Sequence, residues 1–210
     1  LYYPGYYDYL GDFKEASNPD LKAEKSKSFE LQWRSQLADG VVLDTSVYRT
    51  DIHNAIVLDD EYIPRNVANV RINGFETSLQ HEVLGAQGVL SLGLVDSRDR
   101  KTGHQLVRVA KRTLSYDLDK QLGAFGVGST WRVASQSFND DKNNVKIAGF
   151  GTMDLRGSWQ ATQDLGIDLR LANIFDKSYT RALYTYDKQS YGYREDRFTI
   201  LLGMTWTPNL

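Results

Sequence analysis

The sequence contains no cysteine among its 210 residues, and it has only four prolines, two methionines and three histidines. Without cysteine, the chain can form neither a disulfide bridge nor a thiolate metal site. The histidines His53, His81 and His104 lie on separate segments, so no shared metal site is expected. No apolar run approaches the ~18 residues that a transmembrane helix requires. These shortages exclude disulfide frameworks, thiolate metal centres and helical membrane spans.

Motifs of catalysis and of phosphate or metal binding are also missing. The net charge of -2 gives no reason to expect nucleic acid as a partner. No nucleophile elbow or Cys/His pair occurs, so no enzyme, no catalytic residue and no cofactor is predicted. The glycines within residues 123–128 are not followed by a helix, as a phosphate-binding loop would be. The oxygen-rich stretch at residues 139–144 lacks the glycine and the distal glutamate of a calcium loop, so we predict no metal ligands there.

The sequence is rich in an alternation of apolar and polar residues, and it also carries 13 tyrosines and four tryptophans. A period of two predicts β-strands, and no segment shows a helical period. Nine segments of about ten residues alternate in this way: 29–37, 41–52, 69–83, 88–96, 113–122, 125–133, 151–161, 165–175 and 197–206. Soluble strands are typically ~5–6 residues long, whereas about ten tilted residues match a strand that crosses a bilayer.

The connections between these segments are alternately short and long. The short turns fall at residues 38–40, 84–88, 123–124 and 162–164, and the long polar connections at 53–66, 97–106, 137–148 and 176–194. Short turns on one rim and long loops on the other are typical of outer-membrane barrels, and a Greek-key sandwich would not keep this alternation. The sequence therefore predicts an all-β fold, namely a segment of a transmembrane antiparallel β-barrel.

The two parities of the strands differ in composition. All four tryptophans lie on the apolar parity and are predicted to be lipid-facing anchors: Trp33, Trp131, Trp159 and Trp206. The opposite parity carries charges of both signs, which suits a hydrated lumen better than a dry core. The charged residues predicted to face the lumen are Arg34, Glu76, Asp117, Arg132, Asp154, Arg156, Asp168 and Arg170. Within this set, Asp154 with Arg156 and Asp168 with Arg170 are expected to form cross-strand ion pairs in the lumen, and not to act as catalytic carboxylates.

An odd number of strands cannot form a complete bacterial barrel, whose strand count is even. The chain also opens on LYYPGYYDYL without an initiating methionine. We therefore expect the sequence to be a piece of a longer protein. Residues 1–24 should form an external loop that enters the first strand, and residues 25–207 a nine-strand meander.

Four segments carry motifs in a fixed order: NPDLKAEKSKSFELQW at residues 18–33, YRTDIHNAI at 48–56, NVRINGFE at 69–76 and ANIFDKSYT at 172–180. They resemble, in the same order, motifs of TonB-dependent outer-membrane receptors. The resemblance covers nearly the whole chain. It implies the C-terminal strands of a barrel of about 22 strands with a plugged lumen, without the plug domain or the TonB box.

The resemblance also implies a function in the bacterial outer membrane. Such a receptor imports its ligand with energy supplied by the TonB–ExbB–ExbD complex through the plug, which the lumenal charges would hold. Residues 106–122 and the end of the chain are most similar to cobalamin (vitamin B12) receptors. Cobalamin is therefore the expected ligand, and a ferric siderophore or haem is the alternative. The other expected partners are outer-membrane lipid, lipopolysaccharide, phage and bacteriocins.

Tyrosines gather in two of the predicted external loops. Those proposed to contact ligand are Tyr6, Tyr7, Tyr184, Tyr186, Tyr191 and Tyr193. A tyrosine ring offers a large amphipathic surface with a hydroxyl group, which suits ligand contact. The same rings could instead form an aromatic girdle and pack within the loops. The sequence leaves both interpretations open.

Two other classes of protein remain as rival hypotheses. A soluble all-β carbohydrate-binding module with tyrosine-rich loops would require a dry interior, which the charged second face opposes. A passive porin would account for the barrel but not for the ordered set of receptor motifs.

Overall fold

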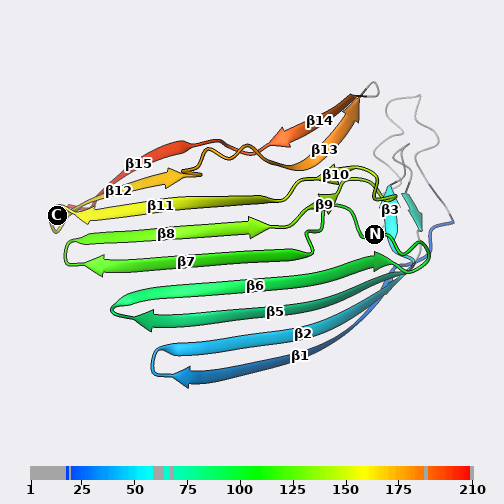
Figure 1. The fold of residues 1–210 in the computed structure, drawn as a ribbon, viewed down its shortest axis with the longest axis horizontal. Helices are drawn as coiled ribbons and strands as arrows, with labels where there is room; N and C mark the ends of the chain where they lie inside the picture. The colour runs from blue at the N-terminus through cyan, green and yellow to red at the C-terminus, as the bar shows by residue number, and fades with distance from the viewer. Residues whose placement is uncertain (1–17, 19, 59–63, 67–68, 187–188, 209–210) are drawn as a thin grey trace.

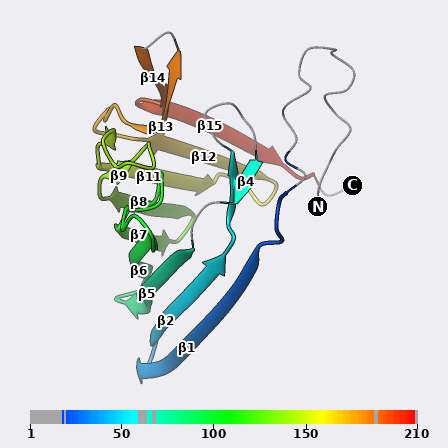
Figure 2. The same ribbon diagram turned by 90° about the vertical axis from the view of Figure 1, so that its right-hand side faces the viewer.

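The chain forms a curved antiparallel sheet in the computed structural model, which describes residues 18, 20–58, 64–66, 69–186 and 189–208. The sheet has nine strands, and each strand pairs with the next long strand of the sequence. The strands are β1 (Lys25–Ala38), β2 (Val41–His53), β5 (Val70–Val83), β6 (Ala86–Asp99), β7 (Arg112–Leu122), β8 (Phe125–Ala134), β11 (Phe150–Gln160), β12 (Leu165–Ala172) and β15 (Thr199–Trp206). Figure 2 shows them following an arc from β1 to β15, so that the sheet has a convex and a concave face. The predicted all-β meander of nine strands is confirmed.

Three short hairpins lie within the long connections, and the sequence did not predict them. They are β3 (Ile56–Leu58) with β4 (Pro64–Asn66), β9 (Ser137–Phe138) with β10 (Lys146–Ile147), and β13 (Thr180–Tyr186) with β14 (Gln189–Arg194). All three lie at the same end of the sheet, and the short turns lie at the opposite end (Figure 1). Among the described residues, no helix is long and apolar enough to span a membrane.

The turn between β5 and β6 is shorter than predicted. Val83 pairs directly with Ala86, so only Leu84 and Gly85 form the turn. Both residues have positive φ angles, 54° and 69°, which is the geometry of a two-residue turn that matches the twist of the flanking strands. Strand β6 therefore begins earlier than the sequence suggested. It also runs on to Asp99, beyond the predicted start of the long connection.

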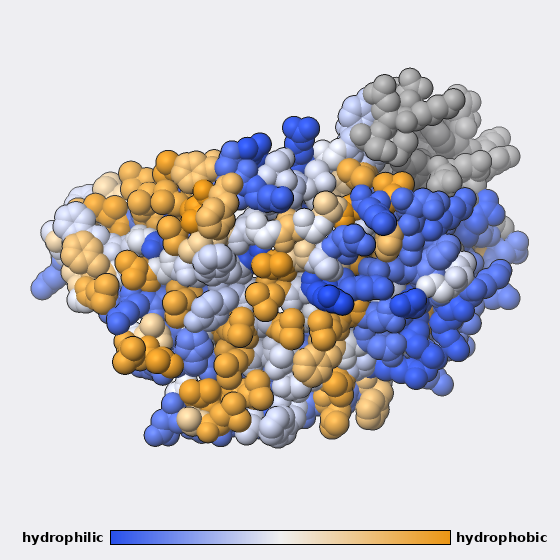
Figure 3. Space-filling model, in the orientation of Figure 1, coloured by the Kyte–Doolittle hydropathy of each residue, from blue (hydrophilic) through white to orange (hydrophobic). Residues whose placement is uncertain are grey.

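Hydrophobic side chains lie on the outside of this sheet instead of in a dry core. Among the described residues, the buried hydrophobic side chains are only Ala55, Val70 and Ile147. Trp33 and Trp206 are 57% and 68% exposed. Figure 3 shows hydrophobic residues spread over the strands of the convex face and hydrophilic residues gathered at the end with the long connections. A soluble sandwich would instead bury these residues between two sheets.

All four tryptophans share the convex face. Trp159 and Trp206 are at or next to the ends of β11 and β15, beside the short turns, and the ring of Trp159 stacks on Phe125 at 5.9 Å between centroids. Trp33 and Trp131 lie nearer the middle of their strands, where they pair with Thr45 and Tyr116. Two of the four therefore stand away from the strand ends, where interfacial aromatic residues usually lie.

Two of the sequence motifs meet across β2 and β5. Tyr48 pairs directly with Gly74, and a Cβ atom on Gly74 would collide with the Tyr48 ring. The Tyr48 hydroxyl donates a hydrogen bond to Oε1 of Glu76 at 2.9 Å. The glycine therefore provides the space in which the tyrosine lies flat against the neighbouring strand, as in other pairs in which an aromatic ring covers a strand glycine.

The first motif is fixed by contacts with the β3–β4 hairpin. The backbone N–H of Lys22 donates to Oδ1 of Asn66 at 2.7 Å, and Nδ2 of Asn66 donates back to the Lys22 carbonyl at 2.9 Å. The carboxylate of Glu24 accepts from the Ile56 N–H at 3.2 Å. These bonds tie the segment before β1 to the connection after β2. Of the predicted external loop, residues 1–17 and 19 lie outside the described residues.

Replacement of Gly74 by alanine should destabilise the barrel. The new methyl group would displace the Tyr48 ring and break its bond to Glu76, at a cost of about 1–3 kcal/mol. The measurement is the midpoint of urea unfolding of the full-length protein in detergent. The matched control is Gly157→Ala, because a Cβ atom on Gly157 meets nothing within 4 Å. Equal midpoints for the two variants would refute the packing role of Gly74.

Candidate functional site

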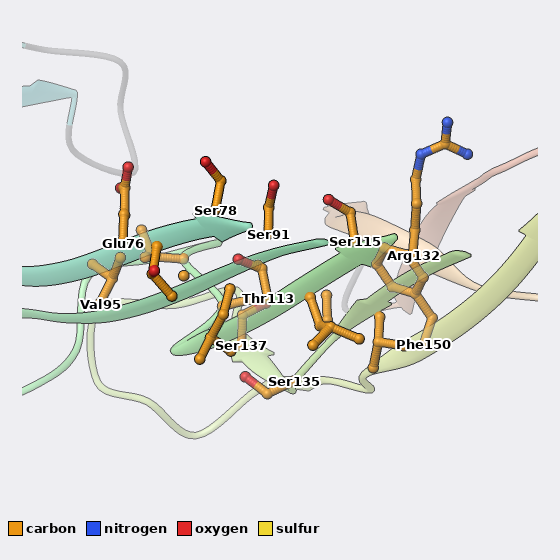
Figure 4. A pocket seen from close by; sticks show the side chains of 18 of the residues that line it. Glu76, Ser78, Ser91, Val95, Thr113, Ser115, Arg132, Ser135, Ser137 and Phe150 are labelled. Carbon is orange, nitrogen blue, oxygen red and sulfur yellow. The ribbon is translucent and has the colours of Figure 1, made fainter. Parts of the chain in front are cut away.

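The concave face contains a cavity of about 820 Å³ near the end with the long connections. Figure 4 shows side chains of neighbouring strands directed to it, among them Ser78, Ser91, Ser115 and Arg132. Serines and threonines make up a large part of this lining, beside apolar residues such as Val95 and Phe150. The hollow therefore offers both hydrogen-bonding groups and apolar surface.

Three arginines line this cavity: Arg108, Arg132 and Arg181. Nε of Arg108 donates to Oδ1 of Asn139 at 3.2 Å, and one of its terminal nitrogens donates to the Leu183 carbonyl at 3.3 Å. The guanidinium of Arg181 lies 5.5 Å from the centre of the Phe150 ring, which is a cation–π contact. Nε of Arg181 also lies 3.3 Å from the carboxylate of Glu195. These contacts fix the positions of Arg108 and Arg181.

Three tyrosines form an aromatic cluster on the β13–β14 hairpin. The Tyr184 ring stacks on Tyr191 at 5.3 Å and lies 5.1 Å from Tyr193 at an angle of 49°. Tyr193 is 63% exposed. The structure thus brings together three of the tyrosines predicted to contact ligand. Tyr6 and Tyr7 lie outside the described residues, and Tyr186 belongs to β13 without a described side chain.

The hairpin that carries these rings is held by a residue of another connection. Nδ2 of Asn139 donates to the Leu183 carbonyl and its Oδ1 accepts from the Leu183 N–H, both at 2.9 Å. The Asn139 side chain thereby makes the two hydrogen bonds to the Leu183 backbone that a residue of a neighbouring strand would otherwise make. The contact was not predicted, because residues 139–144 showed only the composition of a solvated loop.

Asp154 is the centre of an ionic network on the concave face. Its side chain is only 5% exposed, and it lies 3.1 Å from Arg132 and 2.7 Å from Arg170. Its second oxygen accepts the N–H of Asn173 at 2.9 Å. One carboxylate therefore links β8, β11, β12 and the turn that follows β12. Because a buried carboxylate is costly without partners, the three contacts account for its presence.

The expected pairing of Asp154 with Arg156 was wrong. Arg156 instead lies 2.8 Å from Asp119 and 3.7 Å from Asp117, both on β7. Gly128 lies between these strands, and a Cβ atom there would collide with the Asp119 carboxylate. Residues two apart on a strand share a face but lie ~6.6 Å apart along it, whereas cross-strand neighbours lie closer. Ion pairs on this face therefore connect strands, as expected, although the partners differ from those predicted.

The remaining predicted lumenal residues also lie on the concave parity. Arg34 approaches Asp44 at 3.7 Å, and Glu76 accepts the Tyr48 hydroxyl. Arg170 pairs with Asp154 and not with Asp168, so the second expected pair was wrong as well. No ion pair of Asp168 occurs in the part of the chain that the structure describes. Asp168 lines a second concave hollow instead, together with Arg156 and Arg170.

The ANIFDKSYT motif forms a clamp between the end of β12 and the start of β15. Asn173 has a φ of 50°, and its Nδ2 donates to the carbonyls of Lys177 and Asp196 at 2.9 and 3.1 Å. Asp176 accepts from Nε of Arg197 at 2.6 Å and from the Phe198 N–H at 3.0 Å. The Arg197 guanidinium, with the Phe198 N–H, lowers the pKa of Asp176 to about 2. These contacts hold together the two ends of the connection that contains the β13–β14 hairpin.

In the part of the chain that the structure describes, no three His, Asp or Glu side chains come close enough to hold a metal ion. The loop carboxylate of Asp140 accepts the N–H groups of Val145 and Asn144 at 2.6 and 3.1 Å. These backbone bonds lower the pKa of Asp140 and hold its loop closed. The carboxylate therefore has a structural role within its own loop.

The curved meander, its apolar convex face and its charged concave face define a segment of an outer-membrane β-barrel. A family described as TonB dependent receptor-like, beta-barrel matches residues 1–175. The chain belongs to this family of outer-membrane transport receptors, as its motifs suggested.

Solved structures of receptors from this class share the fold. The ferric yersiniabactin uptake receptor FyuA from Yersinia pestis aligns with a TM-score of 0.79 and 18% identity over 87% of this chain and 30% of its own. The copper transporter OprC aligns with a TM-score of 0.77 and 20% identity over 90% and 32%. The pyoverdine receptor FpvA from Pseudomonas aeruginosa PAO1 aligns with a TM-score of 0.73 and 16% identity over 92% and 31%. The chain thus spans about a third of the length of each.

Removal of the Asp154 carboxylate should weaken the sheet. The Asp154→Ala variant of the full-length receptor should lose about 2 kcal/mol of unfolding free energy, less than for a fully buried pair because both arginines are half exposed. Urea unfolding in detergent measures the change. Asp168→Ala is the matched control on the same face, and its unfolding free energy should change by less than ~0.5 kcal/mol. A loss as large for the control would contradict the central role of Asp154.

The clamp should weaken in acid. Because the folded-state pKa of Asp176 lies below the ordinary value, its contribution is present above pH ~4 and is lost as the pH falls through about 2. We expect the unfolding midpoint of the wild-type receptor to fall over this range more steeply than that of Asp176→Asn. The measurement is a series of unfolding curves from pH 6 to 2. Parallel pH profiles would show that the pair with Arg197 does not stabilise the fold.

Proposed function

We propose that this chain is the ligand-binding part of the barrel of a TonB-dependent import receptor whose ligand is an anionic metal chelate of the siderophore type. The observation that carries the proposal is the position of the tyrosine cluster beside three fixed arginines. The base of the β13–β14 hairpin lines the cavity through Thr180 and Arg181, and its outer part carries Tyr184, Tyr191 and Tyr193.

The chemistry of these groups suits a large, flat, negatively charged ligand. Tyrosine rings cover aromatic or apolar surface at low entropic cost and offer hydroxyl groups. The arginines attract carboxylate, catecholate or hydroxamate oxygens by charge-assisted hydrogen bonds. Hydroxyl groups of the cavity wall, such as Ser78 and Ser115, add further donors and acceptors. A ligand that approaches from the outer part of the β13–β14 hairpin would therefore contact the tyrosine rings first and the arginines of the cavity next.

A siderophore is favoured over cobalamin by the solved relatives. By their names, FyuA takes up ferric yersiniabactin and FpvA binds pyoverdine, while OprC transports copper. Cobalamin remains the second candidate, and it rests on the resemblance of residues 106–122 to cobalamin receptors. A structure of FpvAI in complex with pyocin S2 supports bacteriocins as further partners of this chain.

The concave charges would hold a plug domain in the complete receptor. Arg132, Arg156 and Arg170 keep part of their surface exposed while they pair with carboxylates, so they retain donors for a second partner. In this proposal residues 25–207 are the wall, the plug lies against the concave face, and the TonB–ExbB–ExbD complex supplies energy through the plug.

Binding to the purified full-length receptor tests the ligand class. Isothermal titration with a ferric triscatecholate, a ferric hydroxamate and cyanocobalamin should give micromolar or tighter binding for at least one ferric chelate. Binding of cyanocobalamin alone would replace the proposal by the second candidate. The absence of binding by all three probes would overturn both.

Truncation of the tyrosine cluster should weaken binding of the ferric chelate that the titration identifies. Tyr184→Ala together with Tyr193→Ala should raise the dissociation constant about tenfold or more, because each ring contributes about 1 kcal/mol. The matched control is the double replacement by phenylalanine, which keeps the rings and should retain most of the affinity. Unchanged binding by the alanine variant would assign these rings to packing within the loop.

A further inference from the structure

The side-chain oxygen of Asn139 joins two parts of the candidate ligand site. Oδ1 of Asn139 accepts a hydrogen bond from Nε of Arg108 at 3.2 Å and another from the Leu183 N–H at 2.9 Å. Arg108 lines the cavity and lies in the connection between β6 and β7, whereas Leu183 lies in β13 next to Tyr184. One atom therefore links an arginine of the cavity to the hairpin that carries the tyrosine cluster.

The hydrogen bonds among Asn139, Arg108 and Leu183 form a closed network. Nδ2 of Asn139 donates to the Leu183 carbonyl at 2.9 Å, and a terminal nitrogen of Arg108 donates to the same carbonyl at 3.3 Å. Each of the three residues is thus bonded to the other two. A network of this kind restricts its members more than separate hydrogen bonds would.

The position of Leu183 determines where the tyrosine rings lie. Leu183 pairs with Gly192 in the hairpin, and the next pair along the strands is Tyr184 with Tyr191. The Tyr184 ring in turn stacks on Tyr191 and contacts Tyr193. The backbone that the network binds is therefore one residue away from the centre of the aromatic cluster, and a shift there would move all three rings.

The loop that carries Asn139 is itself fixed, so it can act as a support. The Asn139 N–H donates to the Val145 carbonyl at 2.8 Å, which closes the loop. Asn143 in the same loop donates to the Gln105 carbonyl at 2.9 Å and accepts from the Gln105 N–H at 2.7 Å. The loop is therefore bound to the β6–β7 connection through Asn143 and to the β13–β14 hairpin through Asn139.

The hydrogen bonds of the Asn139 amide argue against direct contact with a ligand. An amide oxygen has two lone pairs, and here the two are used by Arg108 and the Leu183 N–H. The amide nitrogen is used by the Leu183 carbonyl. The Asn139 side chain is therefore committed to the protein, and its effect on a ligand would act through Arg108 and the tyrosine hairpin.

We propose that Asn139 is a positioning residue that determines specificity, because it sets the spacing between Arg108 and the tyrosine cluster. A metal chelate binds tightly when its anionic oxygens reach the arginine while its ring or apolar surface reaches the tyrosines. A support that holds both groups at one spacing before binding lowers the entropic cost for chelates of matching shape. This role rests on the proposed siderophore-type ligand, and it adds the residue that selects among such ligands.

Replacement of Asn139 by alanine should weaken ligand binding to the folded full-length receptor. Titration with a ferric triscatecholate and a ferric hydroxamate measures the change. The dissociation constant of the chelate that the wild type binds more tightly should rise about tenfold, because the spacing is no longer fixed before binding. The constant of the other chelate should rise by a smaller factor, because that chelate matches the wild-type spacing less well.

The matched control is Asn144→Ala in the same loop. The Asn144 N–H donates to Asp140, and its side chain makes no hydrogen bond within the described part of the chain. Its replacement should therefore leave both dissociation constants unchanged. Unchanged affinity in Asn139→Ala would overturn the proposal, and so would an equal factor for the two chelates or an equal loss in the control.

A double-mutant cycle separates positioning of the rings from general support of the fold. When Tyr184 and Tyr193 are both replaced by alanine, the position of the hairpin should matter little. Addition of Asn139→Ala to that variant should then raise the dissociation constant by less than about twofold. A further tenfold loss would show that Asn139 acts independently of the rings and would contradict the proposal.

Hydrogen exchange in the absence of ligand tests the support itself. The Leu183 amide should exchange about tenfold faster in Asn139→Ala than in the wild type, because its acceptor is removed. Amides within β8 should keep their rates. Unchanged exchange of the Leu183 amide would overturn the positioning role.

The two measurements distinguish failure of the support from failure of the ligand class. If neither ferric chelate binds the wild type, the proposed function fails and the role in specificity fails with it, while faster exchange of Leu183 would still identify Asn139 as the support of the hairpin. Folding of each variant is checked by heat-modifiable migration. If Asn139→Ala fails to fold, Asn139→Ser provides the same comparisons, with an expected loss of affinity of about fivefold.

Discussion

In hydrocarbon, every backbone N–H and C=O group must find its partner within the protein, and in the described sheet the antiparallel ladder of nine strands meets that requirement between all neighbouring strands, leaving the outer edges of β1 and β15 for further strands. The period of two follows from it, because each strand then separates two environments. This explains why Leu31 and Trp33 are exposed while a carboxylate, that of Asp154, is buried among arginines. The polarity of an ordinary globular domain is inverted throughout the sheet.

Local alternation could be predicted from the sequence, but register could not. The strand positions, the shared face of Trp159 and Trp206 and the alternation of short and long connections all follow from residues close in the chain. Ion-pair partners depend on which residues lie opposite each other, and nothing within a single strand specifies this. For that reason Arg156 was assigned to Asp154 and proved to bind Asp119. The short hairpins were missed because most of their strands are only two or three residues long, which is too short for a period of two to be recognised.

The sequence motifs of the family prove to be cross-strand units and not separate signatures. Tyr48 comes from one motif and Gly74 and Glu76 from another, and the ring needs both the space of the glycine and the carboxylate. Asn173 and Asp176 likewise bind residues that precede β15. The irregular alternation of β2 in the sequence also had a cause, since Arg49 and Asp51 occupy the apolar parity at the rim.

The bond between Asn139 and Leu183 joins two connections that lie far apart in the sequence. Because one loop supplies the support for the other, the two cannot diversify independently. An insertion or deletion within residues 139–145 would shift the β13–β14 hairpin, which carries Tyr184 and Tyr193. Evolution of a new ligand preference in such a receptor would therefore proceed by paired changes. A designer who wished to transplant the tyrosine hairpin into another barrel would have to move both loops together.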